Sequence, residues 1–181
     1  MLTDSEVEEM PLYRGANLFQ LTRTGSLVDS SSTLTFSREP TGIGFDPSTQ
    51  ALFISDDDKY EIFIVRPGLD GRYGTADDPL TSFSTEDCEG IGYDPKRKTL
   101  LVVDSRESKI FELTRAGELV RIISLSTARD ANRALAAVTV APTSNPNDSP
   151  SATSYWVTDR RVDNNADPNE NDGRIYEVLL P

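Results

Sequence analysis

The sequence of 181 residues predicts an all-β protein built from repeated units, on three observations. Residues 42–65 match residues 90–113 at a shift of 48, with 9 of 24 positions identical. Residues 18–28 match residues 110–120 with 7 of 11 positions identical, at a shift close to two repeat lengths. Each unit contains short apolar runs separated by turn residues, a pattern typical of strands rather than helices.

A period in the high forties, with several short strands in each unit, is typical of β-propeller blades. We therefore expect about three and a half four-stranded blades, which together form an incomplete propeller sector. Residues 1–12 are acidic and poor in pattern, so they are expected to be flexible. The repeat domain, residues 13–181, is expected to comprise a partial blade at 13–37, a blade at 38–85, a blade at 86–130 and a partial blade at 131–181.

The blade at 86–130 shows the expected strands plainly. In residues 90–93, glycines alternate with larger residues, so one face of this innermost strand is bare backbone. Residues 99–103 are mostly apolar, as expected of a strand covered on both faces. The third and fourth strands are expected at 109–114 and 118–125.

The chain is expected to begin on the third and fourth strands of one blade and to end on the first three strands of another. Degenerate copies at 137–142, 155–159 and 175–178 mark the last unit. Because closed propellers typically have 4–8 blades, such a chain leaves exposed sheet edges. We expect either a sector of a larger propeller or a homodimer that closes the ring.

An aspartate follows the second strand in each copy that includes this strand, at Asp56, Asp104 and Asp159. Aspartate side chains accept hydrogen bonds from backbone N–H groups in turns. We therefore expect these carboxylates to cap the turn that leads into the third strand.

Composition limits the function. The formal net charge is −12, which argues against nucleic acid and anionic membrane surfaces as partners. No apolar run approaches the ~20 residues of a transmembrane helix, and the first residues lack a signal peptide. There is no histidine, which removes His-dependent catalysis and His-based zinc sites, and Cys88 has no second cysteine to pair with.

The segment Gly-Ile-Gly-Tyr-Asp-Pro at 90–95, with its copy at 42–47, resembles NHL-type propellers. It is also similar to the wider group of regucalcin-, gluconolactonase- and phytase-like propellers. Such blades host binding proteins, lactonases, phosphoesterases and structural domains. In the hydrolytic members a metal lies at the mouth of the central channel, and Glu89 resembles the glutamate that opens an inner strand there.

The segment Gly-Leu-Asp-Gly-Arg-Tyr-Gly-Thr-Ala-Asp-Asp at 68–78 resembles a loop common in calcium-dependent bacterial surface and secreted proteins. Calcium takes six to eight oxygen ligands, and glycines let the chain wrap so that carbonyls point inward. The alternative is a solvated loop with good turn chemistry. The candidate ligands are Asp70, Thr75, Asp77 and Asp78.

A second acidic loop, residues 159–173, is expected between the second and third strands of the last unit. So many carboxylates would repel one another unless a cation or the nearby arginines neutralise them. A calcium loop and a salt-bridged polar loop are equally favoured. The candidate ligands are Asp163, Asn165, Asp167, Asn169 and Asp172. The connections of a blade alternate between its two faces, so the two acidic loops are expected on opposite faces.

Taken together, these patterns predict a calcium-stabilised propeller module that binds an unknown protein or small-molecule ligand. The resemblance implies an extracellular or cell-surface location within a larger protein. No nucleic-acid binding and no membrane insertion are expected. One alternative is a metal-dependent hydrolase of phosphoesterase or lactonase type that uses Glu89; another is a purely structural segment.

Overall fold

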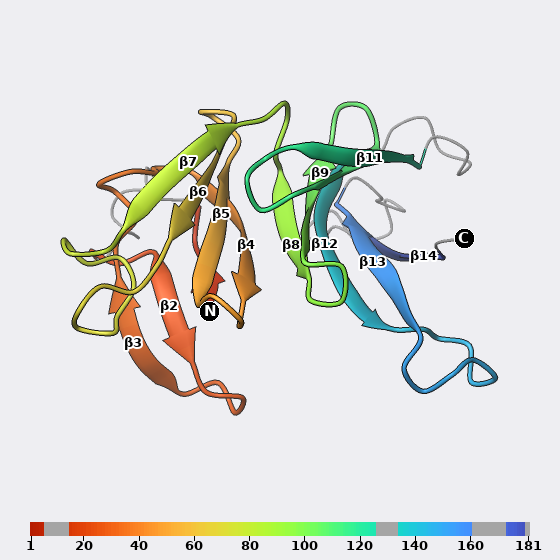
Figure 1. The fold of residues 1–181 in the computed structure, drawn as a ribbon, viewed down its shortest axis with the longest axis horizontal. Helices are drawn as coiled ribbons and strands as arrows, with labels where there is room; N and C mark the ends of the chain where they lie inside the picture. The colour runs from red at the N-terminus through yellow and green to blue at the C-terminus, as the bar shows by residue number, and fades with distance from the viewer. Residues whose placement is uncertain (6–14, 126–133, 161–172, 180–181) are drawn as a thin grey trace, which may run out of the picture. The chain divides into compact units, whose positions relative to one another are not determined.

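The computed structural model describes residues 1–5, 15–125, 134–160 and 173–179. Within these residues the regular secondary structure consists of β-strands alone. The described strands form four antiparallel sheets (Figure 1). The all-β fold of propeller-type blades is therefore confirmed. No helix in this part of the chain is long and apolar enough to cross a membrane.

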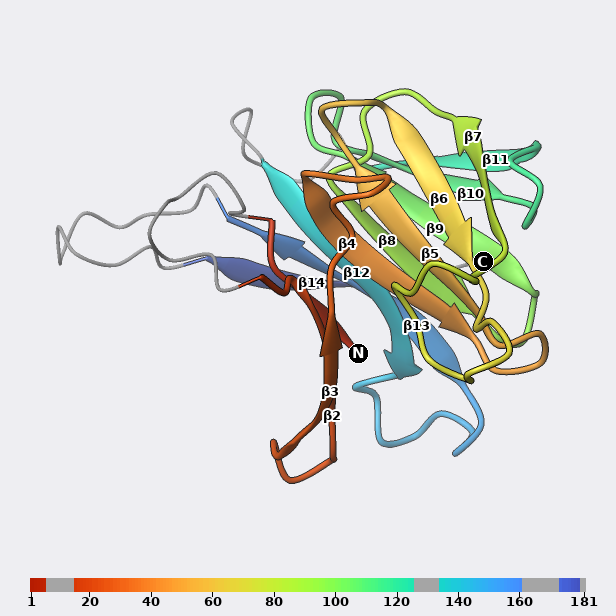
Figure 2. The same ribbon diagram turned by 90° about the vertical axis from the view of Figure 1, so that its left-hand side faces the viewer.

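The first of two compact units, Met1–Cys88, contains two sheets. The three-stranded sheet has the order β1 (Leu2–Thr3), β2 (Leu18–Leu21) and β3 (Leu27–Ser31). The four-stranded sheet has the order β4 (Pro40–Asp46), β5 (Ala51–Asp56), β6 (Glu61–Val65) and β7 (Leu80–Ser84), and Figure 2 shows it after a turn of 90°.

The second unit, Glu89–Pro181, also contains two sheets. The four-stranded sheet has the order β8 (Gly90–Asp94), β9 (Thr99–Asp104), β10 (Lys109–Leu113) and β11 (Leu119–Ser124). The three-stranded sheet has the order β12 (Leu135–Pro142), β13 (Thr153–Asp159) and β14 (Arg174–Val178). In the two four-stranded sheets each strand pairs with its neighbour in sequence, as a propeller blade requires.

The strand β1 differs from our expectation for residues 1–12. Leu2 pairs with Phe19 and Thr3 with Leu18, so the first sheet has a strand in the second blade position as well as the expected third and fourth. Two residues are too few to show an alternating pattern, which is why the sequence did not reveal this strand. Residues 6–12 of the segment expected to be flexible lie outside the described residues.

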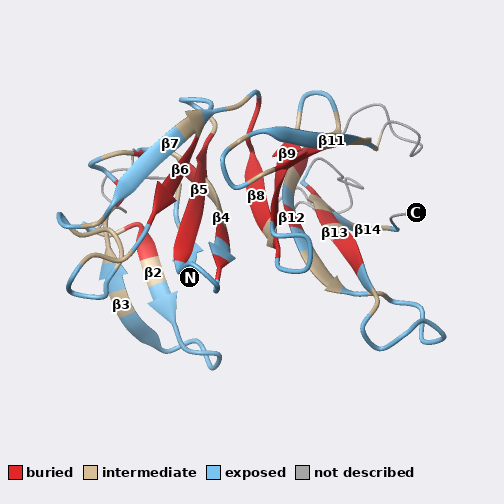
Figure 3. Cartoon of the chain, viewed as in Figure 1, coloured by how far each residue is buried: buried red, intermediate tan, exposed pale blue. Residues whose placement is uncertain are grey.

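The second strand of each complete blade is the centre of its core. All six residues of β5 and all six of β9 are buried, whereas β7 and β11 are largely exposed (Figure 3). In the first unit, Leu52 and Ile54 of β5 pack with Leu18, Phe63 and Val65. In the second unit, the core cluster comprises Leu101, Val103, Ile110, Leu135, Val138, Tyr155 and Val157.

The repeat extends to the backbone of the turns. Gln50 and Lys98, which are 48 positions apart, both have a left-handed backbone, with φ of 56° and 59°. Tyr60 and Ser108 repeat this at the next turn, both with φ of 54°. Such a conformation is uncommon for residues other than glycine, so its recurrence shows that the two blades share turn geometry as well as strands.

Buried carboxylates terminate the second strands. Asp56 Oδ1 accepts a hydrogen bond from the Lys59 N–H at 2.9 Å, and Asp104 Oδ1 accepts one from the Glu107 N–H at 2.8 Å. The predicted capping of this turn is therefore confirmed for both residues. Asp159 Oδ1 accepts a hydrogen bond from the Ala134 N–H at 3.1 Å, just before β12, and the turn that Asp159 is predicted to cap lies outside the described residues. It ties the second strand of its sheet to the first.

Gly92→Val should destabilise the second unit by about 1–3 kcal/mol, because overpacking strains a filled core. A Cβ at Gly92 would collide with the Val138 carbonyl oxygen of β12, and backbone cannot move aside as a side chain can. Chemical denaturation measures the loss. Leu119→Val is the control, since it places valine at a site that is 57% exposed in the same sheet. Equal stability of both variants would contradict this packing.

Candidate functional site

The loop that joins β6 to β7 is the best-defined candidate site among the described residues. Gly71 and Gly74 have φ of 72° and 76°, a left-handed backbone that favours glycine. The Gly71 N–H donates to the Gly68 carbonyl at 3.2 Å, which closes a turn at the start of the loop. These glycines fold the acidic segment back on itself.

The fold brings three of the predicted ligands together. One carboxylate oxygen from each of Asp70, Asp77 and Asp78 lies within 4.8 Å of the others. Asp70 and Asp77 are exposed, and Asp78 is half-buried. Carboxylates at this spacing can share a hard divalent cation, because calcium prefers oxygen ligands.

Asp78 organises the loop from within. Its Oδ2 accepts hydrogen bonds from the N–H groups of Gly74 at 2.6 Å and Thr75 at 3.2 Å, and its Oδ1 accepts from the Gly68 N–H at 3.0 Å. Three residues of the loop therefore converge on one carboxylate.

Thr75 lies between the two neighbouring aspartates. Its hydroxyl is 2.9 Å from Asp77 Oδ1 and 3.0 Å from Asp78 Oδ1, so its single proton serves one of them at a time. The Leu69 N–H donates to Asp77 Oδ2 at 2.7 Å. The Thr75 hydroxyl first, and backbone N–H donors second, lower the pKa of Asp77 below its usual 3.8.

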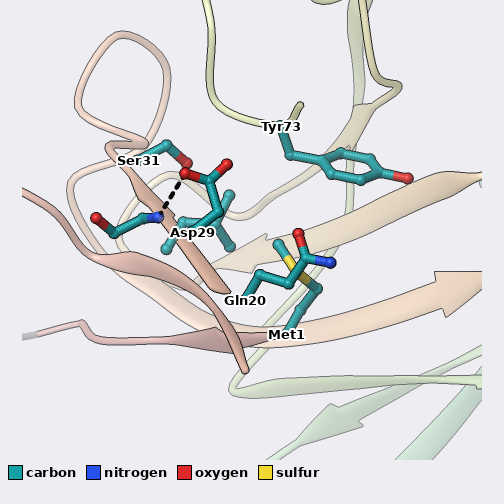
Figure 4. A pocket seen from close by; sticks show the side chains of 7 residues that line it. Met1, Gln20, Asp29, Ser31 and Tyr73 are labelled. Atoms are coloured by element: carbon teal, nitrogen blue, oxygen red, sulfur yellow. Dashed lines mark hydrogen bonds between the residues drawn. The ribbon is translucent and has the colours of Figure 1, made fainter. Parts of the chain in front are cut away.

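The loop is anchored to the rest of the first unit at two points. The Arg72 guanidinium binds Asp29 of β3 through Nε at 2.8 Å and Nη2 at 2.6 Å. The Tyr73 hydroxyl donates to the Gln50 carbonyl at 2.8 Å, in the turn between β4 and β5. Figure 4 shows Tyr73 beside Gln20 and Asp29, and the space between them is too small for a water molecule.

A hollow of about 380 Å³ also borders the loop. Its size falls in the range of small-molecule sites, and its walls combine apolar and polar groups. The lining residues are Thr35, Phe36, Val65, Gly74, Thr75, Ala76, Asp78 and Leu80. The half-buried carboxylate of Asp78 and the hydroxyls of Thr35 and Thr75 supply the polar part of the wall.

Glu89, the candidate ligand from the propeller resemblance, is buried in the second unit. Its carboxylate forms an ion pair with Arg160, and its N–H donates to the Val103 carbonyl at 3.1 Å. This pairing favours a structural role for Glu89, in which it holds the start of β8 against the end of β13. Among the described residues, it joins no group of three metal-ligating side chains.

The remaining predicted ligands, Asp163, Asn165, Asp167, Asn169 and Asp172, lie outside the described residues. The placement of the two acidic loops on opposite faces also stays a prediction.

Two features of the site have no signal in the sequence. Arg72 and Asp29 are 43 positions apart, and neither belongs to the repeat match, so nothing local indicates that they pair. The hollow likewise forms from segments whose proximity depends on packing.

Comparisons with known proteins give limited matches. Residues 69–139, less than half of the chain, match the family described as SdiA-regulated. No curated protein matches the chain. Among solved structures, selenomethionine-substituted virginiamycin B lyase from Staphylococcus aureus is 14% identical, with a TM-score of 0.48, over 90% of this chain and 49% of that one. The PQQ-bound aldose sugar dehydrogenase from Streptomyces coelicolor is 15% identical, with a TM-score of 0.46, over 96% of this chain and 55% of that one. This chain spans about half the length of these two structures.

Thr75→Val should raise the pKa of Asp77 towards its usual value, because the Thr75 hydroxyl is the main group that lowers it. A carboxyl group whose pKa is lower in the folded than in the unfolded chain stabilises the fold at pH values above its unfolded-state pKa. This stabilisation is lost as the pH falls through the folded-state pKa. Acid unfolding of the variant should therefore begin at higher pH. Carboxyl NMR titration measures the shift, and an unchanged Asp77 titration would contradict the assigned hydrogen bond.

Proposed function

We propose that the chain is a calcium-stabilised propeller module that binds a ligand or a partner. The observation that carries this proposal is the convergence of Asp70, Asp77 and Asp78 in a glycine-rich loop, with ligand atoms within 4.8 Å of one another. The loop borders a hollow of about 380 Å³ and is anchored to neighbouring strands.

The electrostatics of the loop favour a divalent cation. Three carboxylates at this separation repel one another, and a bound cation removes that repulsion. Calcium suits the loop better than zinc, because the chain has no histidine and the nearby donors are oxygens. Backbone carbonyls of the loop and water would complete six to eight ligands.

Calcium in this loop would stabilise more than the loop itself. Arg72 contacts β3 of the three-stranded sheet, and Tyr73 contacts the turn between β4 and β5 of the four-stranded sheet. An ion that orders residues 68–78 would thus reinforce the packing of these two sheets, and it would fix one wall of the hollow. Binding at the hollow would then depend on calcium.

The chain should melt at a higher temperature in calcium than in EDTA. At a free calcium concentration of 100 times Kd, the gain is about 2.7 kcal/mol, or roughly 5–10 °C in Tm. Differential scanning calorimetry measures it. The double variant Asp70→Asn with Asp77→Asn should abolish the difference in Tm between calcium and EDTA. Asparagine is chosen because its side-chain oxygen still accepts the backbone hydrogen bonds.

The matched control is Asp58→Asn with Glu86→Gln, which removes the same charge at two exposed sites of the first unit. This control should keep the full response to calcium. An equal Tm in calcium and EDTA for the native chain would overturn the calcium proposal.

The hollow should take up a neutral apolar dye such as Nile red, and more so in calcium than in EDTA. Leu80 lines the hollow and is 44% exposed, so Leu80→Lys should weaken the dye fluorescence without loss of a buried contact. Leu27→Lys, at a 61% exposed site of the same unit that is not among the lining residues, is the control. Equal dye binding by both variants would exclude the hollow as the ligand site.

A further inference from the structure

The wall of the hollow beside the loop at 68–78 carries one charge, and that charge is negative. Of the eight lining residues, Asp78 alone is ionisable, and its side chain is half-buried. This carboxylate accepts hydrogen bonds from the N–H groups of Gly68, Gly74 and Thr75. Among the described residues its hydrogen-bond donors are therefore neutral, and they leave its charge uncompensated.

The rest of the loop adds to this negative charge. Residues 68–78 contain three aspartates and one arginine, so their net charge is −2. The arginine, Arg72, is already paired with Asp29 of β3. The electrostatic field at the hollow therefore attracts cations and repels anions.

The remaining wall suits an apolar body. Phe36, Val65 and Leu80 line the hollow, and the Phe36 ring packs against Phe63 with centroids 5.2 Å apart. An ammonium group of the chain itself already lies at this aromatic pair. Lys59 Nζ is 5.4 Å from the Phe63 centroid, within the range of a cation–π contact, and it donates to the Phe36 carbonyl. Lys59 is not among the lining residues.

We propose that the hollow binds an ammonium group carried on an apolar body. The charge is drawn to Asp78, and the body packs against Phe36, Val65 and Leu80. Two sources supply this chemistry: a free organic amine, and the side chain of a lysine on a partner protein. This inference names the ligand class of the hollow, and it rests on the ligand-binding half of the proposed function rather than on calcium.

The same wall disfavours other ligand classes. None of the lining residues is basic, so a phosphate or carboxylate ligand would meet Asp78 without a compensating charge. A neutral ligand would use the apolar wall alone and gain nothing from the carboxylate. Ligand charge is therefore the property that separates these classes.

The test compares three ligands that share a phenyl group and differ in charge: 2-phenylethylamine, 2-phenylethanol and 3-phenylpropanoate. Each is titrated into the whole chain at pH 7, where the amine is protonated, and the amide signals of Gly74 and Thr75 are followed by NMR. These N–H groups donate to Asp78, so their signals report on the wall of the hollow. The amine should bind about tenfold more tightly than the alcohol, and the propanoate should bind most weakly.

A pair of peptides separates the two sources of the ammonium group. The peptide acetyl-Gly-Lys-Gly-amide presents an ammonium group on a flexible apolar stem, and the same peptide with norleucine in place of lysine keeps the stem without the charge. Binding of the lysine peptide, but not of the norleucine peptide, assigns the hollow to a lysine of a partner protein. Binding of 2-phenylethylamine without binding of the lysine peptide assigns it to a free amine.

Two variants of Leu80 change the charge of the wall outside the acidic loop. Leu80→Glu and Leu80→Lys lose the same apolar contact at a 44% exposed site, but they change the charge in opposite directions. Leu80→Glu should bind 2-phenylethylamine about fivefold more tightly than Leu80→Lys. The controls are Leu27→Glu and Leu27→Lys, at a 61% exposed site that is not among the lining residues, and these two should bind the amine alike.

The titrations are run in calcium and in EDTA, and a preference for the amine over the alcohol in either condition supports the proposal. Equal binding of amine and alcohol in both conditions would overturn the ligand class while leaving the hollow as a binding site. An absence of shifts with all three phenyl ligands and both peptides, or equal binding of the amine by Leu80→Glu and Leu80→Lys, would also overturn it. The response of Tm to calcium is measured without ligand, so failure at the hollow is distinguishable from failure of the calcium proposal.

Discussion

Each complete blade of this protein depends on one constraint: a fully buried second strand that ends on a buried carboxylate. The apolar residues of β5 and β9 fill the core on both faces, so the chain must leave the core abruptly at the end of the strand. Asp56 and Asp104 make this exit possible, because each accepts the N–H of the turn that follows. Asp56 also accepts the Ser37 hydroxyl at 2.7 Å, which ties the entry of its blade to the core.

This constraint explains where the molecule can vary. Strands and the turns after the second strand are held by burial, while the connection between the third and fourth strands reaches solvent. The short connection at 114–118 of one blade is replaced by the long acidic loop at 68–78 in the other, and the strands around it keep their pairing. Charge and potential ligand atoms therefore gather on the loop, as in other folds whose sites are built on variable connections.

The same logic applies to the edges of the sheets. β10 and β14 share a sequence pattern, but only β10 has a described strand on each side. Ile110 is part of the core because it packs in one cluster with Leu135 and Val157 of the neighbouring sheet, whereas Ile175 is exposed to solvent.

The sequence by itself determined the all-β fold, the repeated strands and the acidic loop, because these depend on local pattern and period. It also identified Asp56 and Asp104 as turn caps, since the capped N–H lies three residues away. Tertiary structure alone decided that Arg72 binds Asp29, that Glu89 pairs with Arg160, and that Leu2 and Thr3 add a strand. These contacts join residues far apart in the chain, and their partners are chosen by how the blades pack, which no local pattern encodes.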